Sequence, residues 1–168
     1  MQIVSLPLPV PLPLPLAPGY RPGAVPPDAI AWRLPRHVDD EFVTMLNAYR
    51  RSGGLARADE VVALLERRGG PGVSTLARWI VEHSVISFEW QSQTWLPWFQ
   101  FADPQRVPEP SLADVLAELT TVYDGWELAH WFVRPNSALA ERRPVEALAR
   151  DPAGVLHAAR ADRFVVHG

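Results

Sequence analysis

Residues 73–101, VSTLARWIVEHSVISFEWQSQTWLPWFQF, give the strongest indication of the fold class because their hydrophobic period changes partway along. Up to about His83 the apolar side chains recur at helical spacing, which predicts an amphipathic helix. Beyond it, residues 85–90 and 94–101 are rich in the β-branched and aromatic side chains that favour strands. Gln91-Ser92-Gln93 separates the two runs, so the sequence predicts a helix followed by a β-hairpin.

Two further helices are expected upstream of this stretch. The first is predicted to be capped by Asp39 or Asp40 and to end at Gly53-Gly54, and the second to run from about Ala56 to Arg67. Two helices joined by a glycine turn and followed by a hairpin have the outline of a winged helix-turn-helix, with the third helix as the DNA reader and the hairpin as the wing. We assign this module to residues 37–102.

Residues 1–36 are predicted to form an irregular arm. Nine of the eighteen prolines fall within the first 27 residues, and proline favours polyproline II over helix or central strand. The arm is interpreted as a tether or a strap over a dimer rather than as a ligand for another protein's aromatic groove. It lacks the basic start and helical apolar core of an export signal, and the chain has no cysteine, so we expect a soluble cytoplasmic protein.

Prolines at three positions predict a linker over residues 103–110, after which residues 111–168 turn helical. The predicted capping boxes are Ser111 with Asp114 and Asp124 with Glu127. The predicted helix boundaries that follow are a break at Pro135-Asn136, a short helix opened by Pro144 and a last helix opened by Asp151-Pro152 and ending near Ala161. The expected fold is therefore mainly α with a β-hairpin, in which a winged-helix-like module precedes a bundle of short helices.

The C-terminal part carries a pattern of residue types at fixed spacing. A tryptophan, a Pro-Asn pair, a leucine and a proline are followed by a terminal helix with paired alanines. The pattern lies at Trp131, Pro135, Asn136, Leu139, Pro144, Leu148, Val155, Ala158 and Ala159. Residues 111–168 thereby resemble the Xre/MbcA/ParS-like toxin-binding domain of antitoxins. The chain departs from that family at Ala140, where many members have glycine, and in lacking an Xre-type front half.

The resemblance implies an antitoxin, in which the helical domain dimerises and binds a cognate toxin protein, often a RES-domain enzyme that consumes NAD. The end of the chain is then expected near the toxin's active site, and exposed arginine and aromatic side chains are typical of interface hot spots. The partner-binding candidates are Trp131, Pro135, Asn136, Leu139, Arg160, Arg163, Phe164 and His167.

Operator DNA is a second expected partner. Ser74, which is also predicted to cap the third helix, joins four other side chains that suit phosphates or base edges. The DNA-binding candidates are Ser74, Thr75, Arg78, Gln91 and Gln93. Against DNA binding, residues 49–100 hold six arginines and five acidic residues, a balance that favours an ordinary solvated helix face. A protein-interaction scaffold that does not bind DNA therefore stays the alternative function.

Other chemistry is poorly supported by the sequence. The net charge is −3, with arginine as the only basic residue type besides histidine, which argues against a general nucleic-acid coat. Glu127 and His130 have the E-x-x-H spacing of di-iron bundles but no second copy, and the acidic pairs are explained by helix capping. The tryptophans and phenylalanines of the hairpin are predicted to be core rather than a stacking platform. We therefore expect no cofactor, no metal site, no membrane span and no enzymatic activity.

Overall fold

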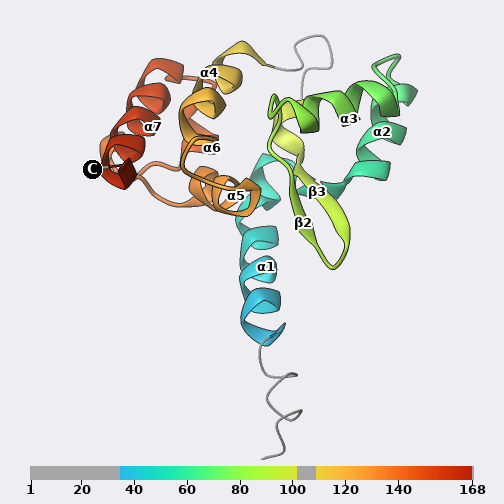
Figure 1. Ribbon diagram of the computed structural model, residues 1–168, viewed down its shortest axis with the longest axis horizontal. Coiled ribbons are helices and arrows are strands. Elements are labelled where there is room, and N and C mark those ends of the chain that lie inside the picture. The colour runs from blue at the N-terminus through green and yellow to red at the C-terminus, as the bar shows by residue number, and fades with distance from the viewer. Residues whose placement is uncertain (1–34, 102–108, 168) are drawn as a thin grey trace, which may run out of the picture. The chain divides into compact units, whose positions relative to one another are not determined.

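The computed structural model describes residues 35–101 and 109–167, and of Pro35–Val38 and His167 it describes only the backbone. Nearly all of the predicted arm and of the predicted linker thus lies outside the described residues. The contacts divide the chain into Met1–Val38 and Asp39–Gly168, and the account below concerns the second unit (Figure 1). Among the described helices, none combines the length and the apolar composition that a membrane span requires.

The elements are mainly helical, with one small sheet. The α-helices are α1 (Pro35–Tyr49), α2 (Ala58–Arg67), α3 (Val73–Val81), α4 (Pro110–Leu119), α5 (Gly125–Val133), α6 (Pro144–Ala147) and α7 (Pro152–His167). The strands are β1 (Leu55–Arg57), β2 (Phe88–Trp90) and β3 (Gln93–Pro97). The 3-10 turns are η2 (Arg50–Ser52), η3 (Trp98–Phe101) and η5 (Ser137–Leu139).

The sheet has three antiparallel strands rather than the two of the predicted hairpin, in the order β1-β3-β2. The residues of β1 were predicted to begin the second helix. They are a strand because they pair with β3, with Leu55 opposite Pro97 and Arg57 opposite Trp95. The hairpin prediction is confirmed, with a tighter turn: Gln91 and Ser92 both have positive φ, as a two-residue turn between twisted strands requires.

Several predicted helix starts are wrong. The first helix begins at Pro35 rather than after Asp39 or Asp40, and the fourth at Pro110 rather than after Ser111. Proline fits the first turn of a helix because its missing N–H has no partner there anyway. Glu109 caps α4 by accepting from the Leu112 backbone N–H at 3.0 Å.

The third helix begins one residue before the predicted cap Ser74, since Gly72 holds the N-cap position. The Ser74 side chain therefore does not cap this helix. The Asp124–Glu127 capping box is confirmed, with backbone-to-carboxylate distances of 2.8 and 3.0 Å in the two directions. Asp151 also caps α7 as predicted, but that helix continues to His167 instead of ending near Ala161.

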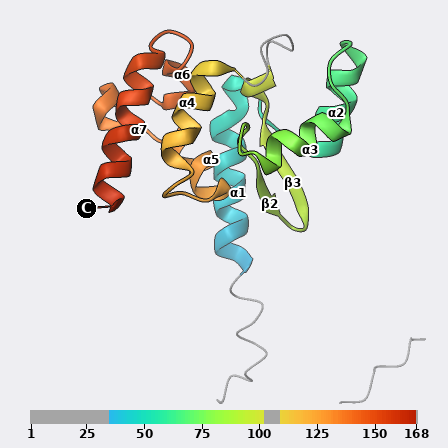
Figure 2. The same cartoon turned by 45° about the horizontal axis from the view of Figure 1, so that its top comes forward.

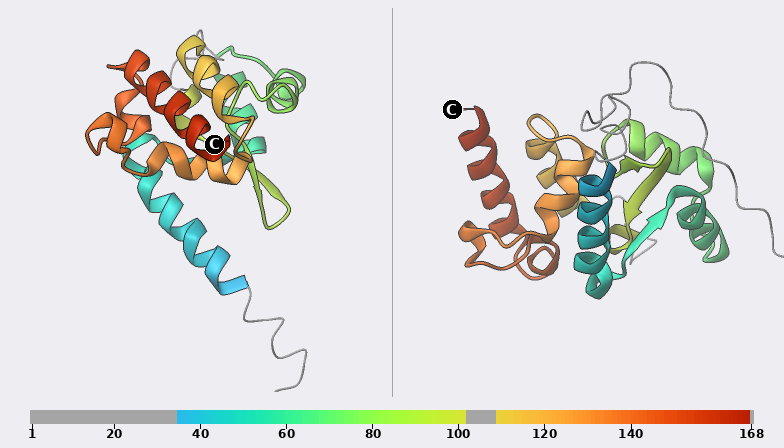
Figure 3. Two further views of the ribbon diagram at one scale, coloured as in Figure 1. Left: turned by 60° about the vertical axis from the view of Figure 1, so that its left-hand side comes forward. Right: turned by 90° about the horizontal axis from the view of Figure 1, so that it is seen from below.

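The larger hydrophobic core joins α1, β2, α4, α5, α6 and α7. Phe42 of α1 stacks on Trp90 with ring centroids 3.7 Å apart, and the Tyr49 hydroxyl donates to the Ala129 backbone oxygen of α5 at 2.8 Å. Figure 2 and the right-hand view of Figure 3 show α1 between the sheet and the C-terminal helices. The first helix therefore packs with both halves of the unit.

A smaller core lies between α2, α3 and β3. It contains Val61, Leu65, Leu76, Trp79, Val85, Leu96 and Phe101. Phe101 is fully buried, which confirms the prediction of a core role at that position, while Trp90, Trp95, Trp98 and Phe99 are partly buried against one core or the other.

The second strand of the hairpin, predicted over residues 94–101, ends at Pro97, and a buried glutamine side chain makes backbone hydrogen bonds beyond it. Residues 98–101 form a 3-10 turn, and Gln100 within it is only 4% exposed. Its Oε1 accepts from the Ile86 backbone N–H at 2.8 Å, and its Nε2 donates to the Ile86 backbone oxygen at 2.9 Å. The side chain thus pairs both backbone groups of Ile86, as a neighbouring strand would.

Candidate functional site

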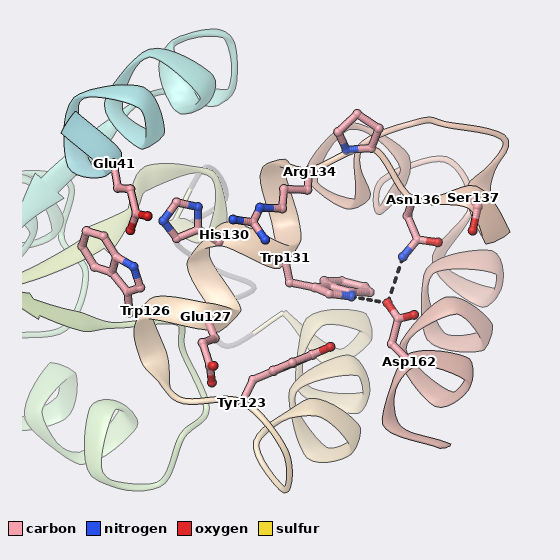
Figure 4. A pocket seen from close by; sticks show the side chains of 11 residues that line it. Glu41, Tyr123, Trp126, Glu127, His130, Trp131, Arg134, Asn136, Ser137 and Asp162 are labelled. Atoms are coloured by element: carbon pink, nitrogen blue, oxygen red, sulfur yellow. Dashed lines mark hydrogen bonds between the residues drawn. The ribbon is translucent and has the colours of Figure 1, made fainter. Parts of the chain in front are cut away.

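A pocket of about 520 Å³ opens beside α5, where the turn after that helix meets the last part of α7 (Figure 4). Polar and aromatic side chains dominate its wall. The lining residues are Glu41, Tyr123, Trp126, Glu127, His130, Trp131, Arg134, Pro135, Asn136, Ser137 and Asp162. Three of the predicted partner-binding residues, Trp131, Pro135 and Asn136, therefore lie together on one pocket.

One carboxylate oxygen ties three segments together at this pocket. Oδ2 of Asp162 accepts from the Trp131 indole N–H at 2.6 Å and from the Asn136 amide at 3.0 Å, as Figure 4 shows. Hydrogen bonds to a charged acceptor are stronger than neutral ones, so this pair fixes α7 to α5 and to the turn that follows it. The tryptophan and asparagine of the sequence pattern thus share a structural partner.

The turn after α5 has an unusual backbone. Asn136 accepts from the Ala138 backbone N–H at 2.9 Å and forms an isolated antiparallel bridge with Arg142. Ala140 is left-handed, with φ 54 and ψ 49, and Glu141 has φ 61. Left-handed backbone costs alanine more than glycine, so the alanine occupies a position that glycine would fill with less strain.

Burial and neighbouring charges shape the titration of the pocket. Burial lowers the pKa of His130 below its usual value, and the Arg134 guanidinium lowers it further while Glu41 opposes the change. Within the described residues, Nε2 of His130 is buried and has no hydrogen-bond partner. Burial raises the pKa of the Tyr123 hydroxyl, and the charges of Asp162 and Glu127 add to that rise.

The E-x-x-H pair of the sequence, Glu127 and His130, lies on this pocket. Glu127 is engaged in capping α5, and the ring of Trp126 meets His130 edge to face at 5.2 Å between centroids. Over residues 35–101 and 109–167, no group of three or more His, Asp or Glu side chains is placed to hold a metal ion.

The predicted partner-binding residues of α7 divide into two kinds. Arg160 and Arg163 are partly exposed, but both pair with Glu118 of α4, with 2.9 Å between Arg160 Nε and the carboxylate. These contacts lower the pKa of Glu118, chiefly through the Arg160 hydrogen bond. The two arginines therefore fasten α7 to α4. Phe164 is 78% exposed and contacts no core.

Two predicted partner residues outside α7 are core residues instead. Leu139 is 1% exposed and Trp131 is 8% exposed, so neither side chain is available for broad contact with another protein in this structure. Pro135 is exposed and Asn136 half-buried. The side chain of His167 lies outside the described residues.

Sequence reasoning missed Val165 and Val166, which extend the exposed apolar end begun by Phe164 and are 76% and 52% exposed. Helical periodicity could have indicated this exposed end. The buried stripe of α7 runs through Val155, Ala158 and Ala159 at helical spacing, and Phe164 and Val165 do not lie on that stripe.

The predicted DNA-binding residues are solvent-accessible but lie in two places. Ser74 and Arg78 are exposed and Thr75 half-buried on α3, next to the exposed apolar Val73. The exposed Gln91 and Gln93 lie at the turn of the hairpin, at the end away from α3 (Figure 1). The structure does not bring the two sets into contact.

The C-terminal half therefore offers a polar pocket and, further along the same helix, an apolar end. Asp162 joins the two, because it lines the pocket and precedes Phe164 by two residues. Comparison of the chain with protein-family models, with curated proteins and with solved structures found no match.

Proposed function

We propose that this chain is an antitoxin-like protein that binds and neutralises a cognate toxin enzyme of the RES type through the end of α7. The observation that carries the proposal is a contrast along that helix. Its first half is buried at Val155, Ala158 and Ala159, whereas its last described side chains, Phe164, Val165 and Val166, are exposed.

An exposed apolar end on an anchored helix favours a docking role. Burial of a phenylalanine contributes roughly 1.5–3 kcal/mol, which Phe164 forgoes in the isolated chain. The helix that presents it is already held by Asp162 and by the Glu118 pairs, so a partner has little ordering entropy to overcome. Aromatic anchors with this combination of exposure and rigidity are typical of protein interfaces.

The sequence pattern that resembles the Xre/MbcA/ParS-like domain also fits this role. Trp131 and Asn136 converge on Asp162, so residues of the pattern hold the docking helix in place. Ala140, where many relatives have glycine, has the left-handed backbone that glycine adopts readily. The departure at this position therefore costs some backbone strain without changing the turn.

The proposal predicts that a reading frame adjacent to this chain's gene encodes a RES-type enzyme. The test is inhibition of that enzyme by the chain, measured as NAD consumption and as growth on co-expression. The wild-type chain is expected to inhibit, and Phe164→Asp to raise the inhibitory concentration at least about tenfold, because a charge replaces an apolar anchor. Val43→Asp is the matched control, since Val43 is also exposed but lies on α1.

Each result decides between functions. Inhibition that Phe164→Asp leaves unchanged refutes docking by α7. A wild-type chain that neither inhibits nor rescues growth refutes the antitoxin function and leaves the scaffold alternative. If Phe164→Asp instead converts a dimer to a monomer in sedimentation while inhibition persists, the exposed end is the homodimer interface.

A second role, autoregulation by DNA binding, is favoured by the order of elements. The elements follow in the order α1, β1, α2, α3, β2 and β3, and β1 pairs with β3. A winged helix-turn-helix has the same order and the same pairing. In that arrangement α3 is the reader. Arg78 is exposed there and has no ion-pair partner among the residues described, unlike Arg57, which pairs with Glu60.

A gel shift with the DNA upstream of the gene, repeated across salt concentrations, tests this second role. Arg78→Ala is expected to weaken binding and to reduce the salt dependence by about one phosphate contact, whereas Arg150→Ala on the C-terminal side is the control. Absence of a shift at low salt refutes DNA binding and leaves the toxin-binding proposal intact.

A further inference from the structure

Three exposed arginines lie on two segments that meet at the ring of Trp98. Arg50 and Arg51 belong to the short turn η2, and Arg68 directly follows α2. The Arg68 guanidinium lies 5.4 Å from the centre of the Trp98 ring. Gly53, which ends η2, is so close to the same ring that a Cβ added to it would lie 2.7 Å from Trp98 Cδ1. We name the surface formed by the three arginines around Trp98 the arginine patch.

The arginines of the patch have no counter-charge within the described part of the chain. None of the three forms an ion pair with a described carboxylate. Other arginines do, as when Arg142 pairs with Asp151 at 3.1 Å and Arg160 with Glu118 at 2.9 Å. The positive charge of the patch is therefore available to a ligand, whereas those of Arg142 and Arg160 are already engaged.

The near-neutral balance of residues 49–100 conceals this local excess of positive charge. Two of the five acidic residues in that range, Asp59 and Glu60, pair with Arg57. The Glu66 carboxylate is directed at the turn before α3, where its Oε1 would lie 2.9 Å from a Cβ added to Gly72. The patch is therefore locally basic although the net charge of the chain is −3.

The patch lacks the apolar centre of a tight protein interface. Such interfaces are centred on a few well-packed anchors from which water is excluded. Over residues 39–101 and 109–166, the large apolar side chains that are exposed lie on α1, α3 and α7, and none lies on η2 or α2. Trp98 itself packs against the smaller core and is approached by Arg68. A partner therefore gains affinity at the patch mainly through charge.

A charged surface of arginines suits the phosphate backbone of nucleic acid. A guanidinium donates two parallel hydrogen bonds to one phosphate, and stacking of Arg68 on a ring leaves the N–H groups at its edge open. Neutralised phosphates release their condensed counterions, which gives affinity without apolar contact. Single strands are bound largely by aromatic faces that stack on bases, and Trp98 is already in contact with Arg68 and Gly53. The patch therefore favours a duplex over a single strand.

We infer that the arginine patch binds the phosphate backbone of double-stranded DNA without reading its sequence. The patch is formed by η2 and the end of α2, so it is a different surface from the exposed side chains of α3. The inference goes beyond the proposed function, because it requires neither a toxin nor an operator.

The experiment is fluorescence anisotropy of a labelled random-sequence DNA duplex, titrated with the whole chain at several salt concentrations. The logarithm of the association constant is expected to fall linearly with the logarithm of the salt concentration. Its slope should be about −3 when each arginine of the patch holds one phosphate. Affinity at low salt should be the same for the random duplex and for any other duplex of equal length, because the backbone is common to all sequences.

Charge-removing variants assign the contacts to the patch. Arg68→Gln should reduce the salt slope by about one, and Arg50→Gln combined with Arg51→Gln by about two. All three side chains are exposed, so the variants are expected to remain folded. Arg150→Gln is the matched control, since Arg150 is also exposed and forms no ion pair with a described residue but lies between α6 and α7. It should leave the slope unchanged.

The outcomes separate this inference from autoregulation. Equal affinity for the random duplex and for the DNA upstream of the gene, with a slope that the patch variants reduce, supports the inference while it refutes operator recognition. Three results overturn it. They are no binding of the random duplex at low salt, a slope that the patch variants leave unchanged or that Arg150→Gln reduces equally, and binding of poly-glutamate in place of DNA, which would assign the patch to an acidic protein.

Discussion

Replacing Gln100 by leucine is expected to destabilise the chain far more than the loss of one surface amide would. The glutamine side chain is 4% exposed and pairs both the N–H and the carbonyl oxygen of Ile86, at 2.8 and 2.9 Å. Leucine has a similar volume but no polar atom. Gln100→Leu therefore leaves two backbone groups without a protein partner in a buried part of the structure.

The size of the effect follows from the two orphaned groups. An unpaired buried donor or acceptor costs about 1–3 kcal/mol, so the pair costs about 2–6 kcal/mol. The apolar surface that leucine buries offsets about 1 kcal/mol of this. The free energy of unfolding should therefore fall by about 1–5 kcal/mol, a large share of the stability of a small protein.

Urea denaturation followed by tryptophan fluorescence measures this loss. Gln93→Leu is the control, because Gln93 lies on the same hairpin but is exposed, and substitutions at such positions change stability by about 0.5 kcal/mol or less. A Gln100→Leu loss no larger than that of the control would refute the reasoning. It would mean that the Ile86 backbone groups do not depend on the glutamine.

Three further predictions concern packing and titration. Gly125→Ala places a methyl group against the Ser87 backbone oxygen and should lower the melting temperature, because overpacking typically costs about 1–3 kcal/mol. Gly72→Ala meets only a flexible carboxylate tip and should change the melting temperature little. The hydrogen bond from Arg160 lowers the pKa of Glu118 in the folded chain. The stability that the Glu118 carboxylate contributes should therefore be present above about pH 4.3, its usual unfolded pKa, and be lost as the pH falls through the folded pKa. Glu118→Gln should remove this part of the acid-induced loss of stability in denaturation measured against pH. His130, whose pKa burial lowers, should titrate in NMR with a midpoint below 6.5, and a midpoint at or above that value would contradict its buried setting.

The features that sequence reasoning found are those fixed by near neighbours. The capping box of Asp124 and Glu127 needs residues only three apart, and the helix end before Pro135 follows from a clash with the adjacent residue. The hairpin follows from two strand-like runs and a short polar turn. Each of these signals is readable within one window of the chain.

The features that were missed depend on distant partners. The strand β1 is three residues long, too short to show alternation, and it is a strand because of its pairing with β3 some forty residues later. The start of α1 is ambiguous in the local sequence, because Pro35 and the acidic pair at Asp39 and Asp40 all suit a helix start.

The candidate site shows the same division. The sequence pattern singled out Trp131 and Asn136, but their common partner Asp162 lies 31 and 26 residues away, and nothing local marks it. Arg160 and Arg163 were expected to contact a partner protein. In the structure both pair with Glu118, which lies 42 residues from Arg160, and so hold α7 against α4. The composition predicted that the arginines of this end would contact a partner protein, whereas in the structure they form ion pairs with Glu118 of the same chain.

The bond from Tyr49 to the Ala129 backbone, 80 residues apart, limits how this protein can be rearranged. Because α1 completes the core of the C-terminal helices, a chimera that grafts residues 111–168 onto a foreign front half would leave a hydrophobic groove open to water. Exchange by recombination is expected to succeed only when the graft takes α1 along, so the shuffling unit is discontinuous in the gene.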